Sequence, residues 1–147
     1  RKESSAASDV YKRQVLSLAS DTIRTNHLYK NVKTWFDAGV AFYPSCGEQE
    51  LTMPVQIFIG TLDEWVSAGG CNSWLSNAGE LVSKGKLDIK IYAGVHHLFN
   101  RETNVELTRS NSQTHDAGGR ATLYNKEADL DSENKMLLFF SRFLKKN

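Results

Sequence analysis

Two side chains that lie far apart in the sequence, Asp63 and His97, could form an acid–base pair. Asp63 follows the apolar segment 54–60 and His97 follows the segment 88–92, so each stands just beyond a stretch typical of a β-strand. Histidine titrates near neutral pH, and a carboxylate bonded to its ring fixes the tautomer and stabilises the charged form. Such a base can activate a hydroxyl or thiol nucleophile. The two residues therefore predict the acid and the general base of a nucleophile–acid–histidine triad.

Each of these residues also has a simpler interpretation. Asp63 could cap the helix that follows it, and His97 could be a hydrogen-bonded loop histidine. Trp65 fits core packing as well as it fits the wall of a substrate pocket. Cys46 could be considered as a nucleophile for His97, but it lies in no strand-to-helix elbow of the Gly-x-Ser-x-Gly or Gly-x-Cys-x-Gly type. We therefore do not assign that role to Cys46.

The sequence contains possible metal ligands but no recognisable metal-binding motif. The available ligands would be His27, His96, His97, His115 and Asp116. Their spacing fits no tight ligand pattern, and the polar surroundings of His115 predict no rigid frame. We expect no metal and no organic cofactor.

The elements that must position the pair are three short apolar segments, residues 40–43, 54–60 and 88–92. Each is bounded by proline or glycine or by polar residues, as buried strands are. A helical pattern over 71–84 separates the second strand from the third, which favours a parallel sheet in an α/β fold. In such sheets, functional side chains gather beyond the carboxyl ends of the strands. Asp63 and His97 both lie there.

Two helices are expected to cover this sheet. The first, between Cys71 and Lys84, should bury the face formed by Trp74, Leu75, Ala78, Leu81 and Val82. The second follows a long polar loop at 100–123 and should begin with Asp131 and Ser132 as its cap. Its buried stripe is predicted to be Met136, Leu137, Phe140, Phe143 and Leu144.

At this point the sequence resembles the dienelactone hydrolase family. The stretch Gly60-x-x-Asp63-Glu64-Trp65 is similar to the acid loop of that family, and Tyr92-Ala93-Gly94-Val95-His96-His97-Leu98-Phe99 resembles its Tyr-Pro-Gly-Ala-x-His-x-Phe loop. Further similarity lies in residues 40–46 and in Tyr124, Ala128, Phe139, Phe140 and Leu144. The resemblance covers roughly residues 15–147, while residues 1–14 are expected to be a disordered, non-native tail.

The resemblance implies roles for individual residues. It makes Asp63 the triad acid and His97 the general base, and it places His96 at a variable position of the loop. Tyr43 and Trp65 become candidates for contact with the substrate. The implied fold is the C-terminal part of an α/β-hydrolase sheet, with about three parallel strands and flanking helices.

The nucleophile elbow of the family has no counterpart in the sequence. In the family it precedes the strand that here ends at Tyr43, with a helix between the two, and residues 15–19 resemble that helix. We expect the whole enzyme to cleave a small-molecule ester or lactone through an acyl-enzyme, and this chain alone to be inactive and poorly soluble. The alternative is a non-catalytic α/β module that binds or scaffolds a partner, because a fold does not fix a function.

Composition limits the partners and the cellular location that we expect. The chain has 147 residues with 18 Lys and Arg against 17 Asp and Glu, a net charge of +1 that gives no reason to expect a nucleic-acid surface. No apolar run approaches the roughly 20 residues of a membrane span. Cys46 and Cys71 could be free thiols or one disulfide, and a disulfide would imply export. We otherwise expect a soluble protein, cytoplasmic or exported, whose oligomeric state the sequence does not specify.

Overall fold

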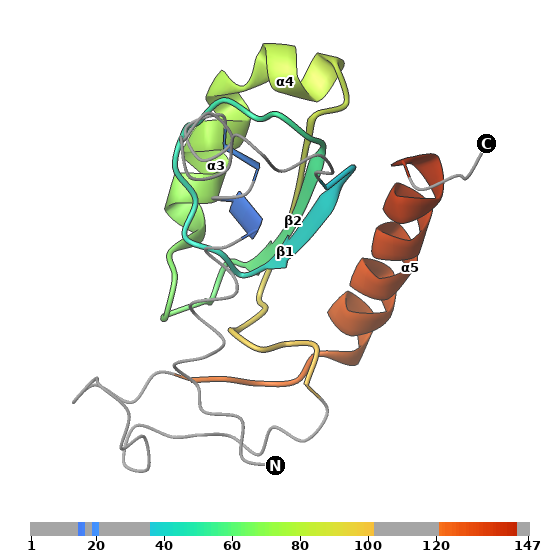
Figure 1. Ribbon diagram of the computed structural model, residues 1–147. Coiled ribbons are helices and arrows are strands. Elements are labelled where there is room, and N and C mark those ends of the chain that lie inside the picture. Colours follow the sequence, from blue (N-terminus) through green and yellow to red (C-terminus); the bar gives the residue numbers. More distant parts are fainter. Residues whose placement is uncertain (1–14, 17–18, 21–35, 102–120, 144–147) are drawn as a thin grey trace, which may run out of the picture.

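The structure is a computed structural model, and it describes residues 15–16, 19–20, 36–101 and 121–143 (Figure 1). Expectations for residues 1–14, for most of the loop at 100–123 and for His27, His115, Asp116 and Leu144 lie outside these residues. Within them, no helix is long and apolar enough to cross a membrane.

Three parallel strands form the sheet, in the order β1-β2-β3. These strands are β1 (Gly39–Phe42), β2 (Val55–Gly60) and β3 (Leu87–Tyr92). Gly39 pairs with Val55, and Val55 pairs with Leu87, so the strands run nearly in register. All six residues of β2 are buried, as expected for a central strand with parallel neighbours. The predicted α/β class and its three strands are confirmed.

Helices flank the sheet on both sides. Figure 1 shows α3 (Ala68–Asn77) on one side and α5 (Lys126–Phe143) on the other, with α4 (Gly79–Ser83) leading from α3 toward β3. Leu16 and Ala19 of the apolar segment 15–19 are buried in the core. Because β2 and β3 are parallel, the chain segments that follow them lie at the same end of the sheet.

The prediction of a single helix over 71–84 is wrong, because the structure divides this stretch between α3 and α4. Gly79 follows the break at Ala78, where the backbone departs from helical geometry. Trp74 and Ala78 are buried as predicted, whereas Val82 is exposed. The predicted face changes direction at the break, and Val82 consequently points away from the core.

The start and the buried face of α5 also differ from the prediction. The helix begins at Lys126, and Asn125 caps it by accepting a hydrogen bond from the backbone N–H of Ala128 at 3.0 Å. Ser132, predicted as a cap, lies inside the helix and donates to the carbonyl of Asp129. The residues that α5 buries are Ala128, Ser132 and Phe139, while Leu137, predicted to be buried, is 62% exposed.

Candidate active site

The acid loop follows β2 directly and is organised around the carboxylate of Asp63. Its Oδ1 accepts hydrogen bonds from the backbone N–H groups of Trp65 at 2.9 Å and Val66 at 2.8 Å. The cap of α3 is Ser67, whose hydroxyl accepts from the N–H of Gly69. Asp63 therefore shapes its own loop through one oxygen and keeps the other oxygen available for a second partner.

The histidine loop follows β3 and is tied to the acid loop by backbone contacts. The N–H of Leu62 donates to the carbonyl of Val95 at 2.9 Å, and the N–H of Gly94 donates to the hydroxyl of Thr61 at 2.9 Å. Gly60 makes this approach possible, because a Cβ atom there would lie 2.0 Å from the carbonyl oxygen of Val95. The two loops thus form one closely packed unit.

This packing brings the two predicted residues into contact. Nδ1 of His97 lies 2.6 Å from Oδ2 of Asp63, and the side chains are only 4% and 0% exposed. A short, buried bond of this kind fixes the ring and favours the tautomer in which Nδ1 carries the proton and donates it to the carboxylate oxygen. Nε2 is then the nitrogen that can exchange a proton with a reacting group. The neighbouring His96 is half-buried, and the bond to Asp63 is made by His97.

Two aromatic rings lie beside His97. The ring centroid of Tyr43 is 4.5 Å from that of His97, and the indole of Trp65 stacks at 5.7 Å with an angle of 24° between the planes. Tyr43 follows β1 with a positive φ of 44°, and its hydroxyl donates to Oδ1 of Asn100. Burial raises the pKa of Tyr43 well above its usual range, which keeps its hydroxyl a neutral donor. Each of the segments that follow the three strands therefore contributes a side chain to this cluster.

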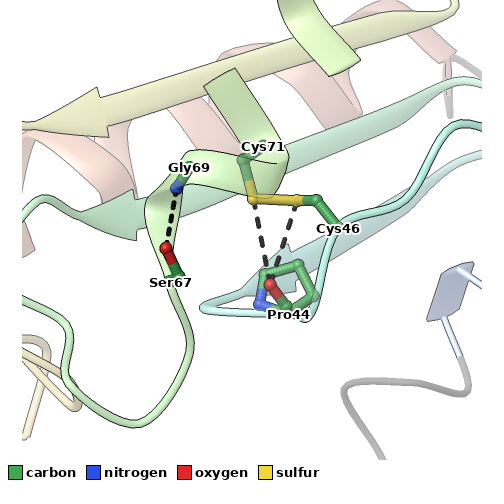
Figure 2. Close-up of a disulfide and its surroundings, with 5 residues drawn as sticks. All are labelled: Pro44, Cys46, Ser67, Gly69 and Cys71. Atoms are coloured by element: carbon green, nitrogen blue, oxygen red, sulfur yellow. Dashed lines mark hydrogen bonds between the residues drawn. A yellow bond between two sulfur atoms is a disulfide. The ribbon is translucent and has the colours of Figure 1, made fainter. Parts of the chain in front are cut away.

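A disulfide between Cys46 and Cys71 joins the segment after β1 to the first turn of α3 (Figure 2). Their Cα atoms are 4.8 Å apart, and the carbonyl oxygen of Pro44 lies 3.8 and 3.9 Å from the two sulfur atoms. Gly70 permits this approach, because a Cβ there would lie 2.9 Å from the carbonyl oxygen of Cys46. Cys46 consequently carries no thiol that could act as a nucleophile.

Some residues of the cluster were missed by the sequence interpretation. Asn100 holds the hydroxyl of Tyr43, and buried Thr122 forms a parallel bridge with His97. Glu64 accepts from the N–H of Ala121 and so connects the acid loop to the same segment. Asn100 stands just after the recognised loop and could have been considered, whereas Thr122 follows a long polar stretch that carries no pattern. Within the described ranges, no group of three or more His, Cys, Asp or Glu side chains could hold a metal ion.

The sequence of the chain matches a known protein family. Residues 25–144 match the profile of the dienelactone hydrolase family, which is most of the chain. The chain belongs to the dienelactone hydrolase family. A search of curated proteins gives no match.

Solved structures show the same fold. A protein from Klebsiella pneumoniae subsp. pneumoniae that is described as a dienelactone hydrolase is 17% identical, with a TM-score of 0.53 over 79% of this chain and 46% of that chain. A carboxylesterase from Lactobacillus plantarum is 9% identical, with a TM-score of 0.57 over 95% of this chain and 57% of that chain. The chain thus spans about half the length of these proteins and has an α/β-hydrolase fold.

Proposed function

We propose that this chain supplies the acid and the general base of a dienelactone-hydrolase-type enzyme that cleaves a small-molecule ester or lactone. The observation that carries the proposal is the buried 2.6 Å contact between Nδ1 of His97 and Oδ2 of Asp63. The pair lies beyond the carboxyl ends of two neighbouring parallel strands, where α/β folds place their sites. Membership of the family supports the same reaction class.

In the proposed reaction, Nε2 of His97 removes the proton of a serine or cysteine nucleophile, which attacks the acyl carbon. The carboxylate of Asp63 stabilises the imidazolium that forms. His97 then returns the proton to the leaving alcohol or enol oxygen, and the acyl group stays on the nucleophile. In the second half, His97 takes a proton from water, hydroxide attacks the acyl-enzyme, and the proton returns to the nucleophile.

The surroundings of Asp63 support its part in this reaction. Two backbone N–H groups bind one oxygen and His97 binds the other, so the buried carboxylate has polar partners on both sides. A carboxylate held in this way is oriented before the reaction begins and needs no rearrangement when the imidazole becomes charged. Tyr43 and Trp65 lie against His97, and a substrate acyl group that reaches Nε2 would pass beside them; their contact with substrate is part of the proposal.

The nucleophile is proposed to lie outside the present sequence, because the sequence contains no Gly-x-Ser-x-Gly or Gly-x-Cys-x-Gly elbow. Cys46 does not fill that role while it is bound to Cys71. The disulfide also supports an oxidising compartment, since disulfides persist mainly in exported proteins.

The test compares this chain with a longer reading frame that includes an upstream elbow, using p-nitrophenyl acetate as substrate. We expect no turnover by the 147-residue chain, turnover by the longer protein, and loss of turnover in its His97→Ala variant. The Asp63→Asn variant should retain the fold and lose about 10⁴-fold in kcat, because the amide supports the wrong histidine tautomer. If the complete gene encodes no elbow, the non-catalytic binding module becomes the better description.

A further inference from the structure

Trp65 touches both members of the proposed acid–base pair. Its backbone N–H donates to Oδ1 of Asp63 at 2.9 Å, while its indole stacks on the imidazole of His97 at 5.7 Å. Asp63 stands two residues before it, in the same loop. One residue therefore links the orientation of the acid to the orientation of the base.

The geometry of the stack has chemical consequences for His97. The bond from Nδ1 to Asp63 fixes one point of the ring, and a second contact is needed to set the tilt of its plane. An indole face nearly parallel to the imidazole, at 24°, provides such a contact, in addition to that of the Tyr43 ring at 4.5 Å. Indole also attracts cations more strongly than the other aromatic side chains, so it favours the imidazolium over the neutral ring.

A purely structural role describes another tryptophan of the chain better. Trp74 on α3 is 2% exposed and belongs to the core between helix and sheet. Trp65 is only partly buried and lies in the loop beyond the sheet, stacked on a polar ring. The two tryptophans thus form a natural pair of test and control.

We propose that Trp65 is a positioning residue for His97, which holds the imidazole plane and stabilises the protonated ring that forms during acyl transfer. This inference rests on the proposed function and deepens it. Other ionisable groups belong to the segments around this cluster and must stay unchanged in a test. They are Asp63 and Glu64 of the acid loop, Tyr43 after β1, His96 and Arg101 of the histidine loop, and Asp129 of α5.

The experiment follows the imidazole protons and carbons of His97 by NMR through a pH titration of the longer protein that includes the upstream elbow. Trp65→Leu keeps an apolar cover but removes the aromatic face, and it should lower the pKa of His97 by about half a pH unit. Trp65→Phe should recover part of that shift. Trp74→Leu should leave the titration of His97 unchanged while it lowers the stability of the fold.

A second readout uses fluorescence. Protonation of His97 should quench the emission of the stacked Trp65, and this pH-dependent step should disappear in both His97→Gln and Trp65→Phe. An unaltered His97 titration in Trp65→Leu, or an equal shift in Trp74→Leu, would overturn the inference.

Kinetics of the longer enzyme separate this inference from the proposed function. Trp65→Leu should reduce kcat severalfold and displace the acidic limb of the pH dependence of kcat to lower pH. If the longer protein hydrolyses no ester while the NMR shift is present, the proposed function fails and the coupling of Trp65 to His97 stands. If it hydrolyses esters and the pH profile of Trp65→Leu matches the wild type, the role of Trp65 is refuted.

Discussion

The carboxyl ends of β2 and β3 are held by hydrogen bonds and backbone contacts, whereas α5 rests on the sheet through a narrow apolar stripe. At the first region, Gly60 lies against Val95, and the Asp63–His97 pair is almost inaccessible to solvent. On α5, Phe139 is buried, but Leu137 and Leu138 are about 60% exposed. The geometry of the pair depends on contacts within the β2–β3 unit, and the apolar helix face contributes little to it.

The strongest test of this comparison is Gly60→Ala. A methyl group at residue 60 would meet the carbonyl of Val95, so one of the two loops must move; we expect a loss of more than about 3 kcal/mol in the free energy of unfolding. Urea denaturation measures this loss. The matched control is Gly79→Ala in α4, where a Cβ meets nothing within 4 Å. That variant should be neutral or more stable by up to about 1 kcal/mol, and equal losses in the two variants would contradict the close contact.

A second pair of variants tests the α5 side. Phe139→Ala removes a ring that is 4% exposed and packs against Phe140 and Phe143, so we expect a loss of about 3 kcal/mol in unfolding free energy. Leu138→Ala removes an exposed side chain and should change stability by less than about 0.5 kcal/mol. Thermal melts of the two variants side by side give the comparison. A large loss in Leu138→Ala would mean that this face is covered.

The third prediction concerns the disulfide. Its loss frees a loop whose ends are 25 residues apart, and chain entropy then predicts a loss of about 3 kcal/mol in stability. The bridge fastens the segment after β1 to α3, while the Asp63–His97 bond depends on the β2–β3 loops. In the double variant Cys46→Ser/Cys71→Ser, we therefore expect a lower Tm but an unchanged Nδ1 proton resonance of His97. Disappearance of that resonance in folded protein would show that the pair needs the β1 side.

The contact between Asp63 and His97 could be predicted from the sequence because its signals are local. Asp63 and His97 each follow a short strand by a few residues, and parallel strands bring their carboxyl ends together. The sulfur pairing could not be predicted, since it depends on a Cα separation of 4.8 Å that only the fold sets.

The prediction for α5 failed for a physical reason. Its buried face uses Ala128 and Ser132, which carry almost no hydrophobic signal, and the real cap is Asn125. Choosing Asp131 as the start placed Leu137 on the buried side in place of Phe139. A search for capping residues just before the charged segment 126–135 would have found Asn125.

The smallest predicted change in stability concerns the contact between α5 and β3. The hydroxyl of Tyr92 donates to Oδ2 of Asp131 at 2.9 Å, and Lys135 binds Oδ1 at 2.7 Å. The hydrogen bond from Lys135, with help from that of Tyr92, holds the pKa of Asp131 below its usual value. A carboxyl with a lowered folded-state pKa stabilises the fold above its unfolded pKa, and this stabilisation is lost as the pH falls through the folded value. Because Asp131 is 41% exposed, solvent screening limits the effect to about 0.3 kcal/mol.

Asp131→Asn should therefore flatten the stability profile slightly between about pH 5 and pH 3 while leaving the His97 titration unchanged, as measured by urea denaturation and NMR on the same samples. Tyr92→Phe is the companion variant, because it removes one of the two bonds to Asp131 and keeps the ring that packs against Phe99. A shift of the His97 titration in either variant would show that α5 influences the pair through β3. The separation between the two regions would then no longer hold.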